Sequence, residues 1–279
     1  MLPFWLSIAV LSLVQAATVL GPSRRAVAVL ERLRSPWWAV IPPLSVLAFV
    51  LVGRTAEHLS AQTLTYLALV AVPPLAALAL GWLVWSTRGP YPLAALLVAP
   101  LFALAWVDRT GLLGEAAAVV LSALSCVTLG VLLAAVTPAR WLTVGIILMA
   151  LADTALVVSD LLQRPNDVLN AAQPAANLPR LQSESFGDAV MGYGDLFVAG
   201  LLGGLLAAAG DRRRQLQGAA LVAGFALGFD LLFFVVNELP ATVPVALATI
   251  VMGLRGTRSA AGEKRAESTR PSGTFTMLR

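Results

Sequence analysis

Charged residues are scarce in this chain. Of its 279 residues, 12% are Asp, Glu, Lys or Arg and 58% are hydrophobic. Soluble domains average about 25% charged and roughly 45–50% apolar residues. A transmembrane helix requires about 20 mostly apolar residues. The composition therefore excludes a water-soluble globule and predicts a polytopic membrane protein with little extramembrane mass.

Cysteine and histidine are almost absent as well. The chain has one cysteine, Cys126, and one histidine, His58. This shortage excludes an internal disulfide, a thiolate metal cluster and a site with two imidazole ligands. A zinc protease motif requires two histidines, and a serine–histidine pair within the membrane requires a histidine in a span, where His58 does not lie. We expect neither a metal nor an organic cofactor.

Nine hydrophobic runs, bounded by Arg, Pro or polar clusters, predict an all-α membrane protein with nine transmembrane helices. A membrane admits helices or closed barrels, and these runs lack the alternation of barrel strands. Residues 1–254 form the predicted membrane domain, with helices one to five in 1–140 and helices six to nine in 141–254. The predicted spans are 2–20, 37–53, 62–86, 92–107, 112–136, 141–162, 187–209, 215–236 and 240–254.

The distribution of basic residues predicts the orientation in a cell (plasma) membrane. Counted over alternate connections, 15 Lys and Arg residues lie on one side and four on the other. The basic side of a membrane protein faces the cytoplasm, so we expect the N-terminus outside and the C-terminus in the cytoplasm. Residues 255–279 are expected to form a disordered basic tail that is attracted to anionic lipid rather than to nucleic acid. The polar connection 163–186 is expected outside.

Three carboxyl groups fall well inside predicted spans, those of Asp153, Asp195 and Asp230. A carboxylate in hydrocarbon is costly, so such residues usually serve a function. Asp153 and Asp195 lie at one depth, about 12–14 Å below the outer surface at about 1.5 Å per residue. If they approach closely they share a proton, and such a pair acts as a base toward water and an acid toward an amide.

Asp195 ends the sequence Gly192-Tyr193-Gly194-Asp195. Two glycines within one helical turn of the carboxyl group remove side-chain bulk. Glycines at these positions would either let a substrate reach the carboxyl group or let two helices pack closely, and the sequence does not decide between these interpretations. Gly200, later in the same span, is expected to serve packing.

These residues resemble a motif set of the presenilin and signal peptide peptidase family, the GxGD intramembrane aspartyl proteases. The GxGD sequence lies on predicted helix seven, Asp153 on helix six, and Pro240-Ala241 opens helix nine. The motif order covers about 141–254, and the helix count covers the whole chain. By this resemblance the chain is a divergent prokaryotic-type member, and Asp153 and Asp195 are its catalytic pair. Substrate-binding roles are implied for Gly192, Tyr193, Gly194, Pro240, Ala241 and Thr242.

The chain departs from the family pattern at two positions. Ala152 stands where the family has Tyr before the first Asp, and Thr242 stands where the family has the Leu of Pro-Ala-Leu. The predicted orientation matches signal peptide peptidases rather than presenilins. The resemblance therefore implies that the partners are transmembrane peptides with a cytoplasmic N-terminus, such as remnant signal peptides.

Three other functions compete with this interpretation. A proton- or cation-coupled transporter would use Asp153, Asp195 and Asp230, although no internal repeat is evident. Prepilin peptidases carry the same GxGD motif, but theirs is followed by a Lys where this chain continues with apolar residues. A non-enzymatic membrane scaffold would leave the paired Asp residues unexplained.

Overall fold

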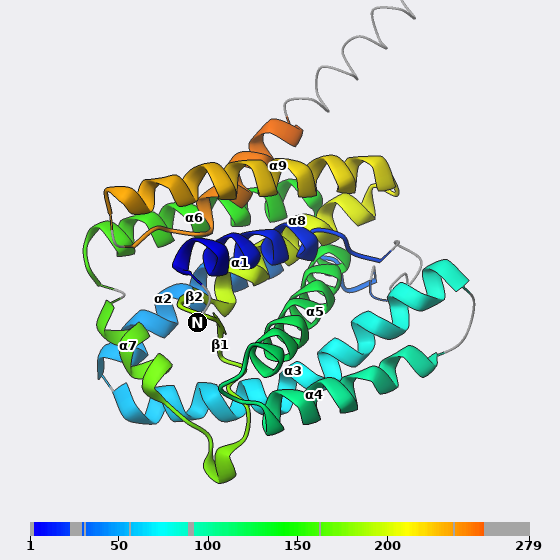
Figure 1. The fold of residues 1–279 in the computed structure, drawn as a ribbon. Coiled ribbons are helices and arrows are strands. Elements are labelled where there is room, and N and C mark those ends of the chain that lie inside the picture. Colours follow the sequence, from blue (N-terminus) through cyan, green and yellow to red (C-terminus); the bar gives the residue numbers. More distant parts are fainter. Residues whose placement is uncertain are drawn as a thin grey trace, which may run out of the picture.

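The computed structural model describes residues 3–22, 30, 32–55, 57–88, 92–161, 163–236 and 238–253. It is about 80% helical with little strand, which confirms the predicted all-α class. The helices are α1 (Phe4–Thr18), α2 (Ile41–Thr55), α3 (Glu57–Arg88), α4 (Val98–Val107), α5 (Leu112–Val136), α6 (Ala139–Val158), α7 (Gln163–Ala171), α8 (Tyr193–Ala208) and α9 (Arg212–Asp230) (Figure 1). A helix over Val243–Gly253 follows. Short 3-10 helices lie at Pro36–Val40, Pro92–Leu97, Ala175–Asn177 and Leu231–Phe234.

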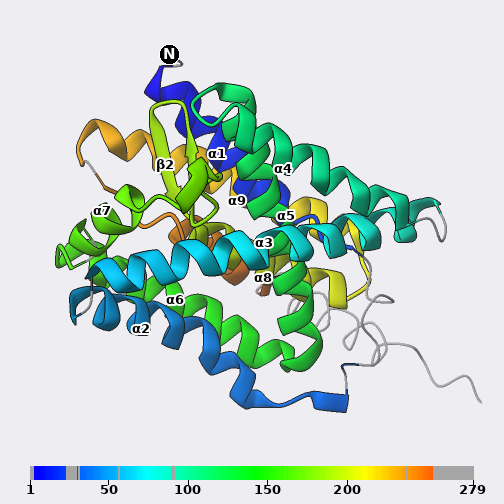
Figure 2. The same ribbon diagram turned by 90° about the horizontal axis from the view of Figure 1, so that it is seen from below.

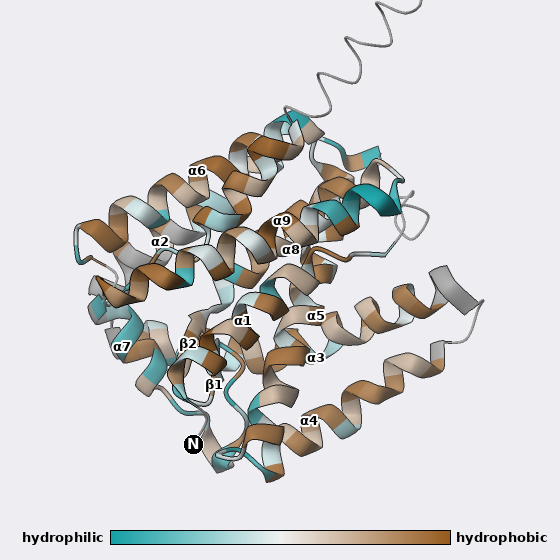
Figure 3. Ribbon diagram, turned by 45° about the horizontal axis from the view of Figure 1, so that its top comes forward, coloured by the Kyte–Doolittle hydropathy of each residue, from teal (hydrophilic) through white to brown (hydrophobic). Residues whose placement is uncertain are grey.

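Four helices of the described chain are long and apolar enough to cross a membrane. Each of the nine predicted spans overlaps a helix, which is compatible with a membrane protein; the nine-span topology stays a prediction. Hydrophobic residues run along most helices, and hydrophilic residues gather on α7 and at the start of α9 (Figure 3). The predicted basic tail, 255–279, lies outside the described residues. The four long helices are Leu59–Val84, Leu112–Val136, Ala139–Val158 and Arg212–Phe234, and shorter apolar helices lie at Phe4–Thr18, Leu93–Val107, Tyr193–Ala208 and Val243–Gly253.

Helix α8 lies at the centre of the fold. It contacts α1, α5, α6 and α9 and lies among them in both views (Figure 1, Figure 2). Its close approach to α5 depends on glycines, because a Cβ added at Gly200 or Gly204 would collide with the α5 backbone at Cys126 or Gly130. The packing role expected for Gly200 is therefore confirmed, and small residues set the distance between the two helices.

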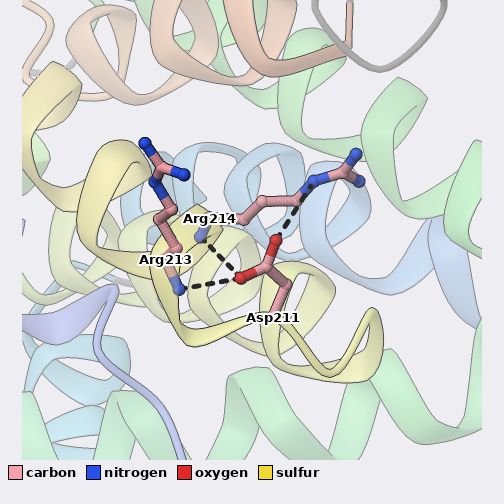
Figure 4. A network of polar contacts seen from close by, with 3 residues as sticks. All are labelled: Asp211, Arg213 and Arg214. Atoms are coloured by element: carbon pink, nitrogen blue, oxygen red, sulfur yellow. Dashed lines mark hydrogen bonds and ion pairs between the residues drawn. The ribbon is translucent and has the colours of Figure 1, made fainter. Parts of the chain in front are cut away.

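Helix α9 begins at a capping aspartate. Asp211 Oδ1 accepts hydrogen bonds from the backbone N–H groups of Arg213, at 2.9 Å, and Arg214, at 3.4 Å. Its Oδ2 lies 3.7 Å from Nε of Arg214 (Figure 4). N–H groups in the first turn have no partner within a helix, so this carboxylate determines where α9 starts.

The start of the seventh predicted span is wrong. Residues 183–192 are not helical but form an antiparallel hairpin of β1 (Ser183–Phe186) and β2 (Ala189–Gly192), and α8 begins only at Tyr193. Gly187, at φ 56°, is the first residue of the two-residue turn, a position that favours glycine. The predicted outer connection 163–186 likewise contains α7 and β1.

The hairpin is fastened to the helices on either side of it. Glu115 of α5 accepts a hydrogen bond from the Gly187 N–H at 2.8 Å through Oε2. Ser7 of α1 accepts one from the Asp188 N–H at 3.3 Å through Oγ. These bonds hold the turn, and the chain that leaves β2 then enters α8 directly.

The glycine contact between α5 and α8 is tested by a matched pair of substitutions. Gly200→Ala is expected to lower the free energy of unfolding by about 1–3 kcal/mol, because the added methyl group overpacks the interface. Gly224→Ala is the control, since a Cβ there would meet nothing within 4 Å; it is expected to be neutral or to stabilise by up to about 1 kcal/mol through helix propensity. Denaturant unfolding in detergent, followed by circular dichroism, gives both values. Equal stability of the two variants would contradict the packing account.

Candidate active site

The structure brings Asp153 and Asp195 into one site and places Asp230 elsewhere. Asp153 lies on α6, and Asp195 is the third residue of α8. Both side chains are partly exposed, and the two carboxyl groups are near enough to interact electrostatically. Asp230 ends α9 and accepts a hydrogen bond of 2.8 Å from Ser12 of α1. The role of Asp153 and Asp195 as a catalytic pair stays a prediction.

The N-terminus of α8 holds Asp195. The Gly192 N–H donates a hydrogen bond of 3.0 Å to Asp195 Oδ2, so the carboxyl group caps its own helix. The positive end of a helix dipole stabilises a negative charge in the first turn. Gly192 has extended backbone angles, φ −74° and ψ 144°, and so marks the change from β2 to α8.

A second helix N-terminus holds Asp153. Thr242 directly precedes the helix Val243–Gly253, and its carbonyl accepts the first helical hydrogen bond, from the Ala246 N–H at 3.1 Å. The Thr242 hydroxyl donates to Asp153 Oδ2 at 2.6 Å, and Thr242 is only 3% exposed. A buried hydroxyl that donates to a carboxylate favours its ionised form. Thr242, where the chain departs from the family pattern, is therefore in direct contact with the first Asp.

Each carboxyl group has one anchored oxygen and one oxygen without such an anchor. Oδ2 of Asp195 is held by Gly192, and Oδ2 of Asp153 is held by Thr242. Within the described part of the chain, no side chain donates a hydrogen bond to Oδ1 of either residue. The side chains are fixed in position, and yet each has an acceptor left for a further ligand.

Gln15 links the two halves of the site. This residue of α1 is 1% exposed, and its Nε2 donates to the carbonyl oxygen of Ala241 at 2.8 Å and to that of Asp195 at 3.3 Å. The contact ties the segment before the last helix to the first turn of α8. Sequence reasoning missed Gln15. The available signal was a long amide side chain in an apolar span, since such side chains form hydrogen bonds between helices.

The residues predicted to bind substrate fall into two groups. Gly192 and Gly194 are exposed, and a Cβ at Gly194 would meet nothing within 4 Å, so packing does not require that glycine. Tyr193, by contrast, is used within the fold, because its hydroxyl shares a hydrogen bond of 2.7 Å with Ser125 of α5. Pro240 is buried and its carbonyl accepts from the Val243 N–H at 3.1 Å. Gly192 and Gly194 are thus accessible, whereas Tyr193 and Pro240 form hydrogen bonds within the fold.

The described residues offer no group of three or more His, Cys, Asp or Glu side chains that could hold a metal ion. In comparisons with known proteins, no family model, curated protein or solved structure matches the chain.

The link made by Gln15 is tested by replacing it with an apolar residue of similar length. Gln15→Met leaves the carbonyl oxygens of Asp195 and Ala241 without their donor and is expected to lower the free energy of unfolding by about 1–3 kcal/mol. Gln163→Met is the control, because Gln163 is exposed. Cys126, the single cysteine, is 0% exposed, so its labelling by a fluorogenic maleimide during denaturant unfolding reports the transition. If the Gln15 variant were as stable as the control, the hydrogen bonds of Gln15 would make no contribution to the free energy of unfolding.

Proposed function

We propose that the chain is an intramembrane aspartic endopeptidase, which hydrolyses peptide bonds within transmembrane segments or remnant signal peptides. The observation that carries the proposal is the paired arrangement of Asp153 and Asp195 among apolar helices. Each carboxyl group is anchored at a helix N-terminus through Oδ2, and Oδ1 has no side-chain donor within the described residues. This arrangement supports a bridging water between the two free oxygens.

The chemistry needs one proton on the pair. The ionised carboxyl group takes a proton from the bridging water while the water oxygen attacks the carbonyl carbon of the substrate. The protonated carboxyl group gives its proton to the carbonyl oxygen, and a tetrahedral diol forms. The first residue then passes its proton to the amide nitrogen, the C–N bond breaks, and the second recovers a proton from the diol. Protons balance, and the pair returns to its starting state.

Asp153 is the better candidate for the base and Asp195 for the acid. Asp195 accepts a hydrogen bond of 3.0 Å from the Gly192 N–H, whereas Asp153 accepts one of 2.6 Å from the Thr242 hydroxyl, and the shorter bond favours the ionised form more strongly. A Thr at this position supplies a donor that an apolar residue would lack. The departure from the family's Pro-Ala-Leu pattern is therefore compatible with activity.

The exposed glycines beside Asp195 support substrate access. Gly194 has open space where a side chain would lie, and Gly192 precedes it at the end of β2. A transmembrane helix must unwind before a protease can reach its peptide bonds, and an extended segment pairs readily with neighbouring backbone groups. The hairpin ends at Gly192, whose N–H bonds Asp195, and offers such backbone.

The resemblance to signal peptide peptidases and the distribution of basic residues support the rest of the proposal. With 15 of 19 Lys and Arg residues on one side, we place the protein in the plasma membrane with the N-terminus outside and the C-terminus in the cytoplasm. Substrates with a cytoplasmic N-terminus suit this orientation. The basic C-terminal tail would then face anionic lipid.

The first test concerns the pair itself. Asp153→Asn and Asp195→Asn are each expected to reduce cleavage of a model signal peptide in proteoliposomes to the background rate, because an amide can neither give nor take the required proton. Asp230→Asn is the matched control: it changes a third carboxyl group, bonded to Ser12 and outside the pair, and is expected to retain cleavage. Undiminished cleavage by either pair variant would overturn the proposal. Proton uptake that depends on Asp230 would favour a transporter.

The second test concerns Thr242. Thr242→Val keeps the side-chain shape and removes the donor to Asp153, and a hydrogen bond to a charged group contributes about 1.5–3 kcal/mol. We therefore expect kcat to fall about tenfold to a hundredfold, with a smaller effect on KM. Thr242→Ser keeps the hydroxyl and is expected to restore most of the rate. Equal rates for the Val and Ser variants would contradict the assignment of Asp153 as the base.

A further inference from the structure

A third carboxyl group lies beside the pair, in the hairpin that precedes α8. Glu184 of β1 is 1% exposed, and neither of its carboxyl oxygens has a hydrogen-bond partner among the described residues. It lies opposite Met191 of β2, which is also buried. A buried polar group without a partner is destabilising, so an apolar residue would suit this position better if the hairpin served packing alone.

Among the residues that the structure describes, no positively charged group faces Glu184. The groups that face it are Ser122 and Cys126 of α5, and Tyr193 and Asp195 of α8. Helix α1, which also packs against the hairpin, carries no ionisable side chain, and neither does β2. Burial, together with the negative charge of Asp195, raises the pKa of Glu184 to about 8. The carboxyl group is therefore uncharged at neutral pH.

We propose that Glu184 is a positioning residue for the aspartic pair, whose buried carboxyl group lies beside Asp195 and, while it holds its own proton, allows Asp195 to become charged during the reaction. The inference rests on the proposed function. Ionised Glu184 would set a second negative charge beside Asp195 and disfavour its charged form. Asp195 becomes charged when it gives its proton to the carbonyl oxygen of the substrate, so ionised Glu184 would slow this step. Glu184 thereby sets the alkaline limit of the reaction.

The pH dependence of kcat/KM tests this role. With each profile scaled to its own maximum, the wild type is expected to lose activity above about pH 8, about tenfold for each pH unit. Glu184→Gln, which cannot ionise, is expected to move this alkaline limb to higher pH. Glu115→Gln is the matched control, because Glu115 bonds the turn of the same hairpin but does not face Asp195. Coincident limbs for the wild type and Glu184→Gln would overturn the proposal.

A second measurement does not depend on activity. The folded state holds a proton on Glu184 that the unfolded chain releases near the ordinary Glu value of 4.5, so stability falls as pH rises from about 4.5 to about 8. In Asp195→Asn the neighbouring negative charge is gone, and the upper end of this window is expected to move to lower pH. Denaturant unfolding across this range measures it. An unchanged window would overturn the interaction between Glu184 and Asp195. Absence of cleavage in every variant would reject the proposed function, and the unfolding window would still decide the interaction.

Discussion

The carboxyl groups of Asp153 and Asp195 are each held at the N-terminus of a helix, and the neighbouring elements are arranged around these two N-termini. Asp195 caps α8 through the Gly192 N–H, and Asp153 is held by Thr242, which precedes the last described helix. An isolated carboxylate among apolar helices is costly, and helix N-termini reduce that cost because they supply unpaired N–H groups and a favourable dipole. Asp230 ends its helix instead, where the dipole disfavours a negative charge. This contrast separates the pair from the third Asp.

The surrounding elements keep the two N-termini in place. Gln15 joins them through two backbone carbonyl groups, and glycine contacts set α8 against α5. The hairpin is fastened to α5 at Glu115 and ends where α8 begins. The same hairpin carries Glu184, whose carboxyl group is buried. Proton sharing within the pair is thereby linked to packing, because α6, which carries Asp153, packs against α8, which carries Asp195, and the hairpin with Glu184 leads directly into α8.

Sequence reasoning was strongest where one physical signal acted alone. The span 112–136 coincides with α5, since Gly111 and the Thr137-Pro138 pair bound a long apolar run. The hairpin was missed although Gly187-Asp188 is a hairpin turn signal, because a short strand without clear alternation is masked by the apolar run that follows. Because the hairpin was not predicted, the predicted start of α8 lies too early in the sequence. The roles of Gln15 and Thr242 depend on contacts between segments far apart in sequence, which no local pattern contains.

A double-mutant cycle on kcat/KM decides whether Asp153 and Asp195 act as one unit. Residues that act together are strongly non-additive, so the variant with both Asn substitutions should cleave no more slowly than either single variant. Three equal residual rates are expected for the two single variants and the double variant. Losses that multiply in the double variant would show two independent residues and contradict a shared-proton pair.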